Sequence, residues 1–92
     1  MIRSFRNRDL KKLWEKGEAL PYRTLVADAI FDILDAIDAA ASSHDPAFIG
    51  FQFDEWNEAE GSRYGIMVSD HWLVSYGWSD GHAIDVDLER LD

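Results

Sequence analysis

The sequence contains no cysteine, so this protein has neither a disulfide nor a thiolate that could act as a nucleophile or metal ligand. It has no apolar run near the length of a membrane span, and residues 1–6 lack the apolar stretch of a signal peptide. These absences favour a cytoplasmic protein without membrane contact. The chain has 92 residues, 47% of them hydrophobic, which predicts one core and a single domain over residues 1–92.

Positive charge is also scarce over most of the chain. Residues 1–23 hold seven basic and three acidic residues, a balance of +4, whereas residues 24–92 hold two basic and fifteen acidic residues, a balance of −13. A site that neutralises phosphates needs clustered lysine or arginine, and beyond Arg23 only Arg63 and Arg90 are available. The acidic part is either an ordinary solvated surface or one that repels nucleic acid, and composition leaves both interpretations open.

Residues 72–92 predict a β-hairpin, because apolar and polar residues alternate on both sides of Asp80-Gly81. A two-residue turn would set Tyr76 opposite Asp85 and bury a carboxylate, so the predicted loop is residues 79–81, with Tyr76 opposite Ile84. The predicted core face carries Trp72, Val74, Tyr76, Trp78, Ile84, Val86 and Leu88. The predicted exposed face, where we expect a site, carries Leu73, Ser75, Gly77, Asp85 and Asp87.

Two helices are predicted before the hairpin. The first follows Asn7, a good N-cap, and ends at Gly17, with Leu10 and Leu13 on its apolar face. The second begins near Pro21 and frays through residues 39–41. Its apolar stripe is Leu25, Val26, Ala29, Ile30, Ile33, Leu34 and Ile37. Its other face carries aspartates, whose mutual repulsion the packing of the stripe must offset.

The remaining segments predict strands and turns. Residues 1–5 are a candidate edge strand, residues 48–53 a strand, residues 54–62 an acidic loop, and residues 64–68 the next strand. The expected fold class is α+β: a short N-terminal strand, two helices, then a four-stranded antiparallel meander. We expect the helices to pack on one face of that sheet.

Short stretches along the whole chain have the order and spacing of one protein family. They are residues 1–5 (MIRSF), 10–13 (LKKL), 15–17 (EKG), 34–40 (LDAIDAA), 50–51 (GF), 66–68 (IMV), Trp72 and 80–89 (DGHAIDVDLE). In these the chain resembles the HigB toxins (host inhibition of growth, or plasmid maintenance killer proteins) of the RelE superfamily. The resemblance implies a RelE-like fold, which agrees with the layout expected above.

The resemblance also implies a toxin of a toxin–antitoxin pair that cuts mRNA in the ribosomal A site by attack of a ribose 2′-OH on the adjacent phosphate. That reaction needs a base, an acid and cations. At the positions that supply them, the chain has Asp54 for a histidine, Asn57 for a lysine, Leu73 for an arginine and Leu91-Asp92 for a tyrosine–histidine pair. We therefore expect the toxin fold without the toxin chemistry, and assign no catalytic residue.

Other candidate site residues are carboxylates, an aromatic residue and lysines. Asp85 and Asp87 are predicted to share one face, where carboxylates can hold Mg²⁺ or Ca²⁺; the simpler interpretation is that they are residues kept from the family, so neither a metal nor a cofactor is predicted. Trp56 is either tucked over the sheet edge or an anchor for a protein partner. Lys11 and Lys12 lie on a basic helix face that is either solvated or a binding patch. The three histidines are interpreted as surface loop residues.

Two functions from different classes remain open. The first is a non-enzymatic, acidic protein-binding module, whose partner is an antitoxin-like or other protein and which binds neither ribosome nor mRNA. The alternative is an active growth-inhibiting mRNA endoribonuclease with rearranged catalytic residues, neutralised by a cognate antitoxin. A third interpretation attributes the acidity to adaptation to high salt, but it does not explain changes at the site positions in particular.

Overall fold

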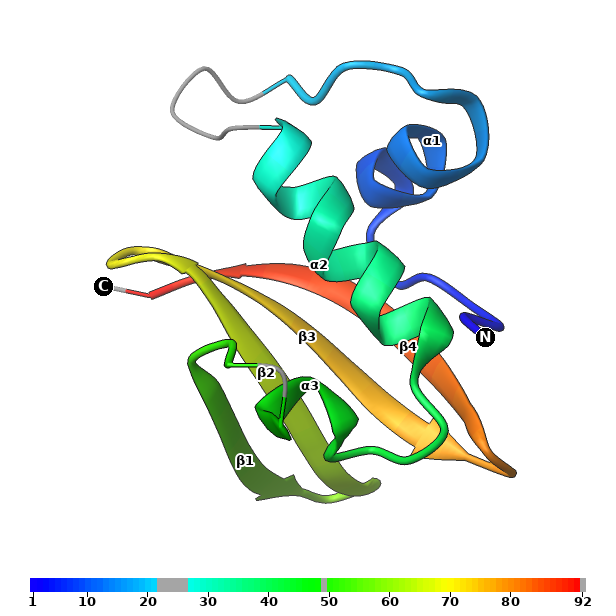
Figure 1. Ribbon diagram of the computed structural model, residues 1–92, viewed down its shortest axis with the longest axis vertical. Helices are drawn as coiled ribbons and strands as arrows, with labels where there is room; N and C mark the ends of the chain where they lie inside the picture. Colours follow the sequence, from blue (N-terminus) through cyan, green and yellow to red (C-terminus); the bar gives the residue numbers. More distant parts are fainter. Residues whose placement is uncertain (22–26, 49, 92) are drawn as a thin grey trace.

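The protein is an α+β fold, and its computed structural model describes residues 1–21, 27–48 and 50–91. The elements follow in the order α1 (Arg8–Lys16), α2 (Ala27–Ala39), α3 (Asp45–Phe48), β1 (Phe53–Glu58), β2 (Gly61–Ser69), β3 (Trp72–Ser79) and β4 (His82–Arg90) (Figure 1). The strands form one antiparallel sheet in the order β1-β2-β3-β4, which confirms the predicted meander. None of the described helices is long and apolar enough to cross a membrane.

The two longer helices follow from their local sequences. The side chain of Asn7 accepts the backbone N–H of Leu10, and Gly17, with φ of 68°, closes α1, so both predicted caps are confirmed. In α2 the buried residues are Ile30, Ile33, Leu34 and Ile37. Ala29, predicted in the same stripe, is exposed, and Leu25 and Val26 lie outside the described residues.

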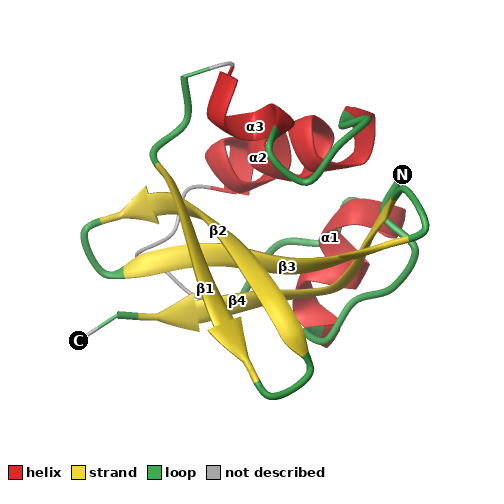
Figure 2. Ribbon diagram, turned by 90° about the horizontal axis from the view of Figure 1, so that it is seen from below, coloured by secondary structure: helices red, strands yellow, loops and turns green. Residues whose placement is uncertain are grey.

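The hydrophobic core lies between these helices and one face of the sheet. Leu10 and Leu13 of α1 and the four buried residues of α2 meet sheet residues Ile66, Val74, Tyr76, Ala83, Val86 and Leu88. Figures 1 and 2 show α1 and α2 on the same side of the strands, and none of the described helices covers the other side of the sheet. Each fully buried leucine or isoleucine contributes about 1.5–3 kcal/mol, so this layer dominates the stability of the fold.

The predicted register of the β3–β4 hairpin is wrong. Ser79 pairs with His82, so the turn has two residues, and Asp80 and Gly81 both have positive φ, 52° and 80°. A two-residue turn was rejected because it would bury a carboxylate. A bulge avoids this burial. Between Ser75–Asp87 and Gly77–Ile84, β3 advances by two residues and β4 by three, which places Leu88 opposite Val74.

The bulge also changes which residues face the core. Ile84 was predicted on the core face, but it lies opposite Gly77 on the face away from the helices. The fully buried Ala83 takes the core position instead. Val74 and Tyr76 are fully buried as predicted, and Trp72 and Trp78 pack partly buried against the core.

Three other segment predictions need correction. The strand predicted at residues 48–53 is wrong for the described residues, because Phe48 is the last residue of α3, residues 50–52 belong to no strand and β1 starts only at Phe53. The predicted acidic loop at residues 54–62 is instead most of β1, its turn and the start of β2. Residues 1–5 form two isolated parallel bridges to β4, Ile2 to Ala83 and Phe5 to Val86, rather than a full strand.

Candidate functional site

The sheet face turned away from the helices is built from every second residue of the strands, except where the bulge interrupts the alternation of β4. It carries Asp54, Trp56 and Glu58 of β1, Arg63, Gly65 and Met67 of β2, Leu73, Ser75 and Gly77 of β3, and Ile84, Asp87 and Glu89 of β4. We call this set the outer face. Strand pairing places Asp54, Gly65, Ser75 and Asp87 in one row across it.

The centre of the outer face is covered by its own side chains, contrary to the prediction that it is exposed. Leu73 is 5% exposed and Ser75 is fully buried. Gly65 explains how Leu73 is covered: a Cβ built there would overlap Cδ1 of Leu73 and lie 3.0 Å from Cζ3 of Trp56. Because residue 65 has no side chain, these two side chains meet over the backbone of β2.

Beside this contact lies a hollow of about 250 Å³, lined by Asp54, Trp56, Met67, Leu73, Glu89 and Leu91. We call it the apolar hollow, because four of its six lining residues are apolar and the other two are carboxylates. The indole of Trp56 is held in place by its Nε1–H, which donates to Glu58 Oε2 at 2.9 Å. The backbone N–H of Leu91 donates to the carbonyl of His71 at 2.6 Å, which positions Leu91 at the mouth.

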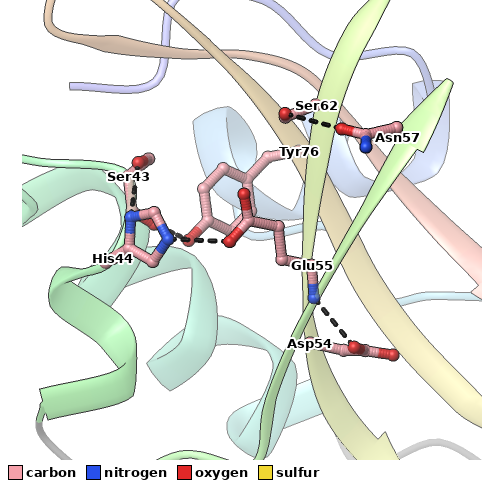
Figure 3. A network of polar contacts seen from close by, with 7 residues as sticks. All are labelled: Ser43, His44, Asp54, Glu55, Asn57, Ser62 and Tyr76. Atoms are coloured by element: carbon pink, nitrogen blue, oxygen red, sulfur yellow. Dashed lines mark hydrogen bonds and ion pairs between the residues drawn. The ribbon is translucent and has the colours of Figure 1, made fainter.

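Three of the five positions that the resemblance marks as catalytic, Asp54, Leu73 and Leu91, therefore meet in one hollow. Asn57 does not join them. It lies on the alternate side of β1, where its side chain accepts a hydrogen bond from Ser62 Oγ at 3.0 Å (Figure 3). Asp92 lies outside the described residues. Trp56, left open between a tucked residue and an anchor, is half-buried and lines the hollow.

Arg63 is an outer-face residue that was not predicted as a site residue. Its side chain is 5% exposed, and its Nη2–H donates to Ser75 Oγ at 2.8 Å. Nε is buried and has no hydrogen-bond partner among the described residues. Burial lowers the pKa of the guanidinium and the charge of Arg6 lowers it further, whereas nearby carboxylates raise it: Glu89, Glu58 and Asp87. Alternation in the sequence indicates this position. Arg63 directly precedes Tyr64, which faces the core with Ile66, so the side chain of Arg63 points to the opposite face.

A second, smaller hollow of about 120 Å³ lies around this arginine. It is lined by Arg6 and Arg63 and by three acids, Glu58, Glu60 and Asp85, together with Gly61, Ser62, Gly77, Trp78 and Ile84. Both signs of charge meet there, so the hollow has no strong preference for an anion or a cation. It belongs to the same outer face as the apolar hollow.

Asp85 and Asp87 were predicted to lie one pleat apart on the same face, but the bulge of β4 lies between them and interrupts this alternation. Asp85 has a left-handed φ of 50°, and its backbone N–H donates to Ser4 Oγ at 2.9 Å. Asp87 points its carboxylate at the next residue, where Oδ1 accepts the N–H of Leu88 at 2.9 Å. Within the described part of the chain, no three histidine or acidic side chains gather as a metal site would require.

The other candidates lie on the helix side of the sheet. Lys11 and Lys12 are exposed on α1. His44 Nε2 lies 2.8 Å from Glu55 Oε1 and its Nδ1 lies 2.9 Å from Ser43 Oγ, while the hydroxyl of Tyr76 donates to the Ser43 carbonyl at 2.8 Å (Figure 3). His44 also packs on Phe53 and Tyr64. With close to half of the His44 and Glu55 side chains exposed, this cluster ties the loop before α3 to β1 and offers no water-excluding site.

The fold and outer face thus describe a small α+β protein with a four-stranded meander whose helix-free face carries the candidate site. No family model matches the chain. Endoribonuclease HigB of Proteus vulgaris is 30% identical to it over 92 residues, covering 97% of both chains. The chain therefore belongs to the HigB-type toxins of the RelE superfamily.

Proposed function

We propose that this HigB-type protein has lost mRNA cleavage and binds a protein partner through its outer face. The apolar hollow carries this proposal. At three positions where the resemblance implies a histidine, an arginine and a tyrosine, the chain places Asp54, Leu73 and Leu91 around one apolar space. These three positions therefore supply neither the expected groups for proton transfer nor the expected cation for the phosphate charge.

The energetics of phosphate chemistry support the proposed loss of mRNA cleavage. Removing a single donor to the transition state costs about 10²–10³ in rate, and here several are replaced at once. Asp54 and Glu89 line the hollow, so a phosphate entering it would meet two carboxylates instead of cations. Trp56, Met67 and Leu73 offer the kind of surface that binds protein side chains.

The family context suggests the partner and the compartment. HigB-type toxins work in pairs with antitoxins, so the proposed partner is an antitoxin-like protein encoded beside this one, in the cytoplasm. Such a partner would bind the protein whether or not mRNA cleavage is retained.

The test is to induce the protein in bacterial cells and follow growth and mRNA integrity, with Endoribonuclease HigB of Proteus vulgaris as the positive control. We expect no growth arrest and intact transcripts. The Leu73→Arg variant should also stay inactive, because Asp54 and Leu91 would still lack the other roles. Rapid arrest with mRNA cleavage by the unaltered protein would overturn the proposal.

One observation favours a second candidate function, an active endoribonuclease with rearranged groups. Arg63 places a guanidinium near the middle of the outer face, where it could take over the charge stabilisation that the arginine missing at position 73 would give. If induction arrests growth, Arg63→Met should abolish the arrest. Lys11→Met removes the same charge from the exposed face of α1 and should not change it.

A further inference from the structure

We propose that the apolar hollow receives one arginine side chain of the protein partner, whose guanidinium is recognised by the carboxylates that line the hollow, Asp54 and Glu89. This inference rests on the proposed function, because it names the chemical group that the outer face recognises. It concerns binding alone and can fail while the loss of cleavage stands.

The size of the hollow limits the ligand. Its volume of about 250 Å³ lies below the roughly 300–1,000 Å³ of typical small-molecule and cofactor sites. One long side chain fills such a space, whereas a helix or a strand does not enter it. The four apolar lining residues, Trp56, Met67, Leu73 and Leu91, require that most of this side chain be apolar.

The lining carboxylates decide the chemistry of the tip. Asp54 comes from the edge strand β1, and Glu89 comes from β4, where it pairs with Leu73. Among the residues that the structure describes, no lysine or arginine lines the hollow. A wholly apolar side chain would take water from both carboxylates without replacing its hydrogen bonds, which costs free energy. A phosphate would be repelled.

An arginine side chain meets both requirements. Its aliphatic stem covers apolar surface while its charged end stays near the rim. Its planar fork of N–H donors binds carboxylates in charge-assisted pairs, and it stacks on aromatic rings such as the indole of Trp56. Lysine has a single point charge and no planar group, so we expect it to bind less tightly.

The charge of the rest of the molecule supports the same partner. Residues 24–92 carry a balance of −13, and the whole chain carries −9. A field of this sign attracts a basic segment and speeds its association, and salt weakens that attraction. The exposed basic residues of α1 lie on the helix side of the sheet and do not compensate the charge at the hollow.

The experiment uses the ¹⁵N-labelled full chain and the indole N–H signal of Trp56 as a local reporter. The probe is a glycine–serine pentapeptide whose one charged side chain is an arginine at its centre, and the matched probe carries citrulline, a neutral isostere of arginine, in its place. We expect the arginine peptide to move the Trp56 signal in a saturable manner. The citrulline peptide should bind about tenfold more weakly, as expected for a lost charge-assisted contact.

Variants locate the binding site. Asp54→Asn combined with Glu89→Gln keeps the size of both side chains and should weaken binding of the arginine peptide about tenfold. Asp32→Asn combined with Asp35→Asn removes the same charge from the exposed face of α2 and should leave binding within about twofold. Resonance dispersion of each variant reports that it is folded.

Three results would overturn the inference: no movement of the Trp56 signal, equal binding of the citrulline peptide, or equal weakening by the α2 double variant. None of these would bear on the growth assay. If growth is unaffected and the peptide does not bind, only the arginine-binding inference fails. If cells arrest with mRNA cleavage, the proposed function itself fails.

Discussion

Arg63, the basic residue in the outer-face set, lies in an environment that is costly for a charged side chain. Its guanidinium is almost fully buried and makes one hydrogen bond, to Ser75 Oγ at 2.8 Å. Among the described residues no carboxylate pairs with it at ion-pair distance. A buried charge with few partners reduces stability relative to an apolar side chain of the same shape, so its presence points to a role other than stability.

We therefore expect Arg63→Met to leave the free energy of unfolding unchanged or to raise it, because the charge is removed and the space stays filled. Arg63→Ala should lower it by about 2–4 kcal/mol, since it also opens a cavity beneath Trp56 and over Gly77. Urea denaturation of both variants measures the difference. Equal destabilisation by methionine and alanine would show that the guanidinium itself stabilises the fold.

Gly65 is the second residue whose identity the outer face requires. A methyl group there would overlap Leu73 and press on Trp56, so Gly65→Ala should cost about 1–3 kcal/mol and disturb the apolar hollow. Gly77→Ala is the matched control, because its nearest contact is Ile84 Cγ1 at 3.2 Å and should yield more easily. Thermal unfolding compares the two, and a Gly65→Ala variant as stable as wild type would contradict this packing.

Among the elements, β4 sets the arrangement of the outer face. Its bulge at Asp85 shifts the pairing by one residue, which turns Ile84 to the outer face and keeps Leu88 on the core face. The N-terminal segment fixes the bulge from the other side: Val86 N–H donates to the Ser4 carbonyl at 3.1 Å, and Arg6 N–H donates to the Val86 carbonyl at 2.8 Å. The two ends of the chain thus determine this geometry together.

The backbone of Asp85 makes this arrangement testable. A left-handed φ of 50° disfavours side chains, so Asp85→Gly should hold or raise stability, whereas Asp85→Val should lower it by about 1–3 kcal/mol. Asp87→Gly, two residues along the same strand, should lower stability by about 0.5–1 kcal/mol, as glycine does inside a strand. Chemical denaturation ranks the three, and equal losses for both glycine variants would argue against the bulge.

In the whole molecule, charge of one sign accumulates on both sides of the fold. The outer face carries Asp54, Glu58, Asp87 and Glu89, while the exposed side of α2 carries Asp28, Asp32 and Asp35. Asp38 is an exception, because its Oδ1 accepts the N–H of Ile2 at 2.8 Å and so joins α2 to the N-terminal segment. A net charge of −9 on 92 residues opposes the compact state by self-repulsion.

Salt should relieve that repulsion. Raising NaCl from about 10 mM to about 1 M shortens the screening length from about 30 Å to about 3 Å and should raise the free energy of unfolding. Asp32→Asn and Asp35→Asn should each raise stability at low salt by a few tenths of a kcal/mol and reduce the dependence on salt. Urea denaturation at each salt concentration measures both effects, and a free energy of unfolding that is independent of salt would rule out self-repulsion as a significant term.

Local signals in the sequence were sufficient for the elements whose chemistry is local. Asn7 and Gly17 mark the two ends of α1, and the four buried residues of α2 lie three and four positions apart. The alternation in the sequence of β2 to β4 predicts the meander. The HigB resemblance was also carried by sequence alone. These predictions succeeded because caps and periodicities depend on residues a few positions apart.

Only the tertiary structure decided the register of β4, the burial of Arg63 and the meeting of Asp54, Leu73 and Leu91 in the apolar hollow. Alternation separates the two faces of a strand, but one extra residue reverses them, and nothing in the local sequence marks Asp85 as that residue. The hollow joins side chains from all four strands and from the segment after β4. Its form depends on Gly65, which has no side chain to keep them apart.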